Sequence, residues 1–113
     1  MRTGGLLVDC HSFPKDLSDV DVCIGVNDDW SRPSDSLIDF AVDHFTSSGY
    51  STSINAPYSN SISPETGFRY PSLMIELNKR TYLHGTDKME MSEALCVRGC
   101  IEDLFCSLLR RYP

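Results

Sequence analysis

The sequence predicts a single α/β domain, residues 1–113, in which helices cover a sheet of largely apolar strands. Short apolar runs alternate with segments of helical periodicity in the order strand, strand, helix, strand, strand, helix. Strands that read as apolar runs are typical of sheets covered by helices. A chain of 113 residues is long enough for one domain with a modest core, and it shows no repeat and no internal boundary.

Four segments carry the pattern of strands. Residues 5–9 form a short apolar run between Gly-Gly and Ser-Phe-Pro, and residues 20–26 alternate apolar and small or polar side chains. Residues 50–55 are richer in Ser and Thr, so we expect them near an edge of the sheet. Residues 72–77 are apolar except for Glu76, which predicts a buried strand.

Two segments carry the pattern of helices. Ser34 is a good N-cap for the first, and Gly49 ends it. Asp87 and Glu90 have the spacing of a capping box for a second helix that continues to Arg111. The expected buried stripes are Leu37, Ile38, Ala41, Val42 and Phe45 in the first helix and Val97, Ile101, Leu104, Phe105 and Leu108 in the second. We expect His44 to be solvated, and Cys96 and Cys100 to share a buried face.

Composition excludes several classes of protein. The formal net charge of −6 and the pI near 4.8 argue against a nucleic-acid binder. No apolar stretch approaches the roughly 20 residues of a membrane span, and the N-terminus has no secretory h-region. The five cysteines lack the spacing of a disulfide framework, which favours reduced thiols. The expected compartment is therefore the cytoplasm.

The phrase Asp9-Cys10-His11-Ser12 follows the first apolar run and places an imidazole at the end of a strand. α/β folds present ligands at strand ends, so His11 is a candidate metal ligand, although a lone histidine there is more often structural. Asp9 lies on the same face of an extended strand and is placed to orient the imidazole. Ser12 either caps a turn or binds substrate.

Glu76 lies inside an apolar run, where a carboxylate is costly unless it is paired or functional. Desolvation raises the pKa of a carboxylate, which suits a general base. The alternative is a buried ion pair with Arg80 or Arg69. Arg80 is itself suited to holding a substrate carboxylate, or else it is an ordinary surface arginine.

Asn55 and Tyr58 end the third strand in the phrase Asn-Ala-Pro-Tyr. They place an amide and a phenol at the sheet edge as candidate substrate-binding groups. Ordinary turn chemistry explains the phrase equally well.

Taken together, these phrases resemble the N-formylglutamate amidohydrolase family. The matching segments occur in the family's order and cover most of the chain: residues 6–12, 21–25, 49–58 and 74–83. The resemblance implies distant kinship with the zinc carboxypeptidases and a three-layer α/β/α, phosphorylase/hydrolase-like fold with a mixed, mostly parallel sheet. It also implies hydrolysis of the amide bond of an N-acyl amino acid, such as release of formate from N-formylglutamate in histidine catabolism.

The resemblance implies a role for each candidate residue. His11 matches a zinc-binding histidine, and Glu76 matches the carboxylate that activates the zinc-bound water. Arg80, Asn55 and Tyr58 match positions that hold the substrate. Zinc is thus the expected cofactor, and a small N-acyl amino acid is the expected partner.

The departures from the family define an alternative. Family members are more than twice as long, and their first half supplies the other zinc ligands. We therefore expect this chain to be the C-terminal part of the fold, lacking the N-terminal strands. Local substitutes for the ligands are Asp9, Cys10 and His84. The alternative is a non-catalytic α/β domain that acts through dimerisation or partner binding, and a homo-oligomer is possible under either hypothesis. A thiol enzyme using Cys10 with His11 is disfavoured, because adjacent strand residues face opposite ways.

Overall fold

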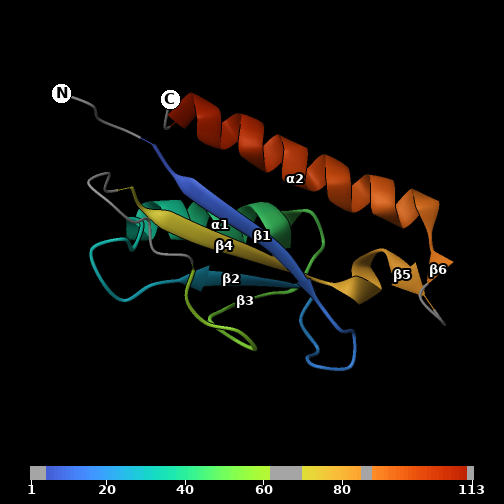
Figure 1. Cartoon of the computed structure of the whole chain (residues 1–113). Coiled ribbons are helices and arrows are strands. Elements are labelled where there is room, and N and C mark those ends of the chain that lie inside the picture. Colours follow the sequence, from blue (N-terminus) through green and yellow to red (C-terminus); the bar gives the residue numbers. More distant parts are fainter. Residues whose placement is uncertain (1–4, 62–69, 85–87, 112–113) are drawn as a thin grey trace.

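The computed structural model describes residues 5–61, 70–84 and 88–111 (Figure 1). Its elements follow the expected order, with a short helix and a small hairpin added after the fourth strand. They are β1 (Leu7–Phe13), β2 (Val22–Val26), α1 (Asp35–Ser47), β3 (Thr52–Ile54), β4 (Ser72–Asn78), the 3₁₀ helix η1 (Lys79–Thr81), β5 (Leu83–His84), β6 (Lys88–Met89) and α2 (Met91–Arg111). No helix in this part of the chain is both long and apolar enough to cross a bilayer.

The described strands form a four-stranded sheet with the order β1-β4-β2-β3. β1 pairs with β4 in parallel and β2 pairs with β3 in parallel, whereas β2 and β4 are antiparallel. The expected mixed, mostly parallel sheet is therefore confirmed. β3 lies at one edge, as its Ser- and Thr-rich sequence predicts, and β1 lies at the other.

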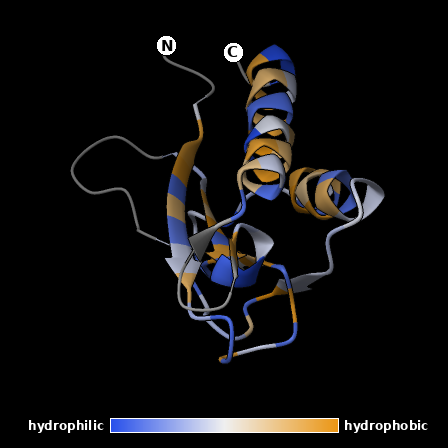
Figure 2. Ribbon diagram, turned by 90° about the vertical axis from the view of Figure 1, so that its right-hand side faces the viewer, coloured by the Kyte–Doolittle hydropathy of each residue, from blue (hydrophilic) through white to orange (hydrophobic). Residues whose placement is uncertain are grey.

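Both helices pack on the same face of the sheet, as the view along it shows (Figure 2). The core lies between them and consists of apolar side chains from β2, β4, α1 and α2. Its buried members are Val22, Ile24, Val26, Leu37, Ile38, Ala41, Phe45, Leu73, Ile75, Cys100, Leu104 and Leu108. No described helix covers the opposite face, so the described residues form two layers of the three-layer architecture.

Local sequence explains how α1 begins and where it packs. Ser34 has extended backbone dihedrals, and its side chain accepts a hydrogen bond from the backbone N–H of Leu37, as an N-cap residue does. The expected stripe faces the core, although Val42 is only partly buried. The expectation for His44 is wrong: its Nε2 lies 2.8 Å from the backbone carbonyl oxygen of Cys100, which joins α1 to α2.

Several element boundaries and one cysteine differ from expectation. β2 begins only at Val22, β3 covers only Thr52–Ile54, and β4 continues to Asn78. β1 continues to Phe13 because all seven of its residues pair with β4, so His11 lies within the strand and not at its end. α2 begins at Met91, and the Glu90 carboxylate accepts hydrogen bonds from the backbone N–H and the hydroxyl of Ser92, so the helix starts later than the expected capping box implies. Asp87 itself lies outside the described residues. Cys100 is buried, but Cys96 is exposed.

Candidate active site

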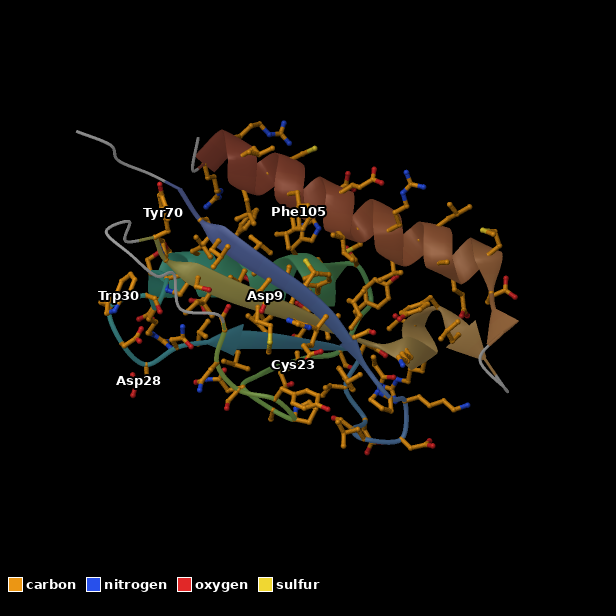
Figure 3. The ribbon with its side chains drawn as sticks, viewed as in Figure 1. Asp9, Cys23, Asp28, Trp30, Tyr70 and Phe105 are labelled. Carbon is orange, nitrogen blue, oxygen red and sulfur yellow. The ribbon has the colours of Figure 1, made fainter. Side chains whose placement is uncertain are left out.

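Several of the candidate functional side chains lie on the face of the sheet that no described helix covers. In register, His11 of β1 lies opposite Glu76 of β4, and Glu76 lies opposite Cys23 of β2. Side chains two residues apart on a strand share a face, so Asp9 joins this row. Figure 3 shows Asp9 and Cys23 on the open side of the strands. We call Asp9, His11, Cys23 and Glu76 the polar row.

Asp9 and His11 are in direct contact. Asp9 Oδ1 lies 2.9 Å from His11 Nε2, and the imidazole side chain is 51% exposed whereas the carboxylate is only 15% exposed. A carboxylate in this position fixes the orientation and tautomer of a histidine. The contact leaves Nδ1 as the ring nitrogen available to a ligand.

Glu76 is buried in the middle of the sheet, with 6% of its surface exposed. Burial raises the pKa of its carboxyl group; the nearby His11 opposes this shift, and the negative charge of Asp9 adds to it. The expected alternative, an ion pair with Arg80, is not formed, and Arg69 lies outside the described residues. Glu76 thus has the environment of a general acid or base at the centre of the polar row.

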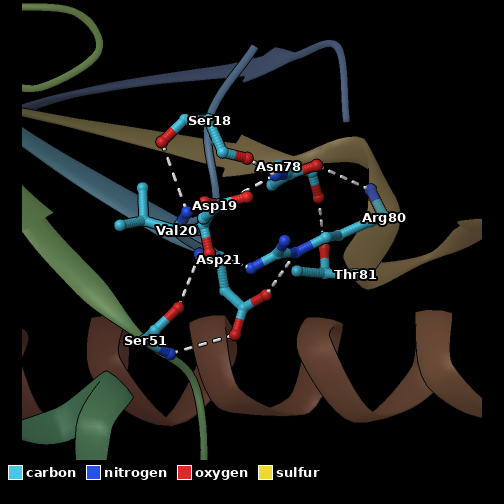
Figure 4. A network of polar contacts seen from close by, with 8 residues as sticks. All are labelled: Ser18, Asp19, Val20, Asp21, Ser51, Asn78, Arg80 and Thr81. Carbon is cyan, nitrogen blue, oxygen red and sulfur yellow. Dashed lines mark hydrogen bonds and ion pairs between the residues drawn. The ribbon is translucent and has the colours of Figure 1, made fainter. Parts of the chain in front are cut away.

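Arg80 is held elsewhere, in a network just beyond the C-terminal end of β4 (Figure 4). Its Nε lies 2.9 Å from Asp21 Oδ1, and its guanidinium also donates to the backbone carbonyl of Asp19. With Asp21 and Thr81 it borders a hollow of about 260 Å³ that is also lined by the first turns of α2. This hollow is on the helix side of the sheet, so the structure does not bring Arg80 together with His11 and Glu76. Its role in substrate binding stays a prediction.

Asn55 organises the loop that follows β3. Its backbone φ of 58° is in the left-handed region, which asparagine tolerates better than most residues. Its side-chain oxygen accepts hydrogen bonds from the backbone N–H groups of Val26, at 2.9 Å, and Asn60, at 3.2 Å. These contacts fix the loop on β2 and use the amide oxygen of Asn55 as a structural acceptor. A contact of Asn55 with substrate stays a prediction.

Tyr58, carried by the same loop, reaches the polar row. Its backbone carbonyl accepts a hydrogen bond from the Cys23 thiol at 3.2 Å. Its ring packs edge-on against Phe13, which lies on the same face of β1 as His11, with 6.2 Å between ring centroids. The side chain is still 41% exposed. Tyr58 is therefore a predicted substrate-binding residue that contacts both a member of the polar row, Cys23, and Phe13 on the same face of β1.

Ser12 and Cys10 point away from the polar row, because they alternate with His11 along β1. Cys10 lines an apolar hollow on the helix side with Leu6 and Phe105. Burial, followed by the charge of Asp9, raises the pKa of its thiol, which is the opposite of what an activated nucleophile needs. Ser12 does not face His11, so a substrate contact of its hydroxyl beside His11 finds no support.

Gly25 and Cys23 also lie on the open face of the sheet, and the sequence alone did not single them out. A Cβ added at Gly25 would lie 2.2 Å from the Asn60 carbonyl oxygen and 2.4 Å from Met74 Cε, so only glycine lets the loop close over β2. A glycine inside an otherwise apolar strand is the available signal, since it marks close approach of another backbone.

The polar row supplies one candidate imidazole for a metal. Within the described ranges, no three His, Cys, Asp or Glu side chains are grouped so as to hold an ion. Asp9 is engaged with His11, Cys10 faces the other way, and the side chain of His84 lies outside the described residues. These residues therefore do not complete a zinc site by themselves.

Comparison with known proteins agrees with the architecture. The crystal structure of N-formylglutamate amidohydrolase from Ralstonia eutropha superposes with a TM-score of 0.74 at 21% sequence identity. The match covers 96% of this chain and 45% of that one, so this chain spans less than half the length of its structural relative. No curated protein matches the sequence. The family model described as N-formylglutamate amidohydrolase matches residues 3–83, and the chain therefore belongs to the N-formylglutamate amidohydrolase family.

Proposed function

We propose that the polar row is part of an amidohydrolase site that cleaves the amide bond of an N-acyl amino acid such as N-formylglutamate. The observation that carries the proposal is Glu76: a buried carboxyl group with a raised pKa that lies opposite His11 in the sheet register. Family membership supports the reaction class. By descent, we extend the proposal to histidine catabolism in the cytoplasm.

In this proposal Glu76 is the general base. Its carboxylate takes a proton from the attacking water, and its raised pKa lets it return that proton to the leaving amine. His11, held by Asp9, borders the place where the acyl carbonyl would lie. The exposed phenol of Tyr58 is proposed to contact the substrate from the loop, with Asn55 setting that loop's position. A contact between Arg80 and a substrate carboxylate at this site would require its guanidinium to leave Asp21.

Zinc is the proposed cofactor, with His11 as one ligand. A catalytic zinc has three protein ligands and polarises the carbonyl as it lowers the pKa of water. The polar row offers one imidazole, and no three candidate ligands are grouped within the described residues, so we propose that the further ligands come from residues beyond those described or from another chain. We assign no step to the metal.

Replacing the base tests the proposal. Formate release from N-formylglutamate is measured with and without added zinc for the wild type, Glu76→Gln and Glu102→Gln. Glu102 is exposed and pairs with Arg98 on α2, so its variant controls for loss of a carboxylate. Loss of a general base should lower kcat by about 10²–10⁴-fold, whereas the control should match the wild type. Equal turnover by Glu76→Gln would remove Glu76 from the mechanism, and no turnover by any form would favour the binding-domain alternative.

A further inference from the structure

The outer edge of β1 is not paired with any described strand. The N–H of Leu7 bonds to the carbonyl of Pro71, on the β4 side. Because peptide groups alternate along a strand, the N–H and C=O groups of Val8, Cys10 and Ser12 point outward. Such a row of free backbone groups is a template for another strand.

Apolar surface lies beside this edge, on the helix side of the sheet. A hollow of about 520 Å³ opens between β1 and the end of α2. Leu109, on its rim, is 67% exposed. The lining residues are Gly5, Leu6, Val8, Cys10, Phe105, Leu108 and Leu109. The edge therefore offers both backbone hydrogen bonds and an apolar flank to a partner.

We propose that β1 pairs with β1 of a second copy of this chain, antiparallel, about a two-fold axis at Cys10. This register pairs all seven residues of the strand, Leu7 with Phe13 of the other copy and so on through Cys10 with Cys10. The outward-facing residues Val8, Cys10 and Ser12 then meet one another as hydrogen-bonded pairs. The pairing does not depend on Glu76 acting as a base, so a failure of hydrolysis leaves it intact.

Charge selects this register over its neighbours. With the axis at Cys10, Asp9 of each copy lies opposite His11 of the other, in the closer type of antiparallel pair with Cα atoms about 4.5 Å apart. An axis at Asp9 would set two carboxylates opposite each other, which is destabilising. An axis at His11 would bring Pro14, which has no N–H, opposite Val8 and shorten the ladder.

The pairing also enlarges the polar row. A two-fold axis perpendicular to the sheet keeps the open faces of both copies on the same side. Asp9 and His11 of the two copies then form one cluster of two imidazoles and two carboxylates. No such group of even three exists within the described residues of a single chain. The pairing would bring further candidate metal ligands to His11, and this consequence rests on the proposed function.

Complementary charge variants test the register. Molar mass is measured by light scattering after gel filtration over a range of concentrations. Wild type should approach twice the chain mass of 12.7 kDa. Asp9→Lys and His11→Glu should each elute as folded monomers. In a dimer of the first variant the introduced lysine would lie opposite His11, and in a dimer of the second the introduced glutamate would lie opposite Asp9. Mixed together, they should dimerise, because the introduced lysine then lies opposite the introduced glutamate, and His11 of one variant lies opposite Asp9 of the other. Monomeric wild type, or a mixture that stays monomeric while wild type dimerises, would overturn the proposal.

Cysteine cross-linking tests the axis. Diamide oxidises two thiols to one disulfide and takes up their two protons and two electrons. Cys10 is exposed, and hydrogen-bonded antiparallel pairs have Cα atoms about 5.5 Å apart, within the range that a disulfide spans. A covalent dimer should form in wild type and in a Cys96→Ser, Cys106→Ser double variant, and be lost in Cys10→Ser. A dimer by mass whose cross-link persists in Cys10→Ser and is lost in the double variant would place the interface elsewhere and refute the pairing.

Discussion

Replacing Gly25 with alanine should loosen the loop that carries Tyr58. The added Cβ would lie 2.2 Å from the Asn60 carbonyl oxygen and 2.4 Å from Met74 Cε, both below any tolerated contact. Met74 has a flexible side chain and can move, but the Asn60 oxygen is backbone. The loop must therefore shift by about 1 Å, and overpacking of this kind costs about 1–3 kcal/mol.

Two other glycines provide matched controls. Gly99 lies within α2 with open space around it, so Gly99→Ala should raise the free energy of unfolding by about 0.5–1 kcal/mol through helix propensity. Gly49 also has open space but a φ of 96°, so Gly49→Ala isolates the cost of backbone strain without a clash.

The assay is urea unfolding followed by circular dichroism, with N-formylglutamate turnover measured on the same protein preparations. We expect Gly99→Ala to be more stable than wild type and Gly25→Ala to be less stable than wild type. A Gly25→Ala variant as stable as wild type would refute the loop contact on which the placement of Tyr58 depends.

Three further predictions follow from contacts of single side chains. Glu76 has a folded-state pKa above its unfolded value, so the native state binds more protons and stability falls as pH rises through this range. Glu76→Gln should therefore exceed wild type in urea midpoint at neutral pH and lose that advantage below the ordinary glutamate pKa; a constant difference would contradict the burial of its charge. Asn55→Gly keeps the backbone conformation but removes the acceptor for two N–H groups, and should lower the free energy of unfolding by about 1–3 kcal/mol; an unchanged midpoint would show that the loop is held otherwise. Ser34→Ala should cost about 0.5–2 kcal/mol by removing the α1 cap, and Ser34→Gly only a few tenths.

Local patterns in the sequence predicted the elements, and non-local contacts account for what they missed. The alternation in residues 20–26 and the cap at Ser34 are local signals, and both held. β1 is longer than expected because Ser12 and Phe13 find partners on β4 that are more than sixty residues away. Likewise, Lys88 and Met89 pair with His84 and Leu83, so the second helix begins only at Met91.

In the candidate site, too, the sequence predicted local contacts and missed non-local ones. Asp9 and His11 are two residues apart on one strand, so their contact follows from the alternation of side chains alone. The neighbourhood of His11 and Glu76 required the sheet order, which apolar periodicity does not specify. Arg80 shows the limit most clearly. Its sequence environment fits a substrate clamp, but Asp21, distant in sequence, holds its guanidinium on the other side of the sheet.

The two faces of this sheet differ in character, because successive side chains along each strand point to opposite faces. On β4, Leu73, Ile75 and Leu77 pack toward the helices, while Met74 and Glu76 face the open side. The helices thus bury enough apolar surface to hold a fold in which the other face keeps a desolvated carboxylate beside an exposed imidazole. Shifting β4 by one residue would bury Glu76 in the apolar core and expose Ile75, so the same core packing that stabilises the sheet also fixes the register of the polar row. Core packing on one face is therefore the physical condition for the chemistry that we propose on the other.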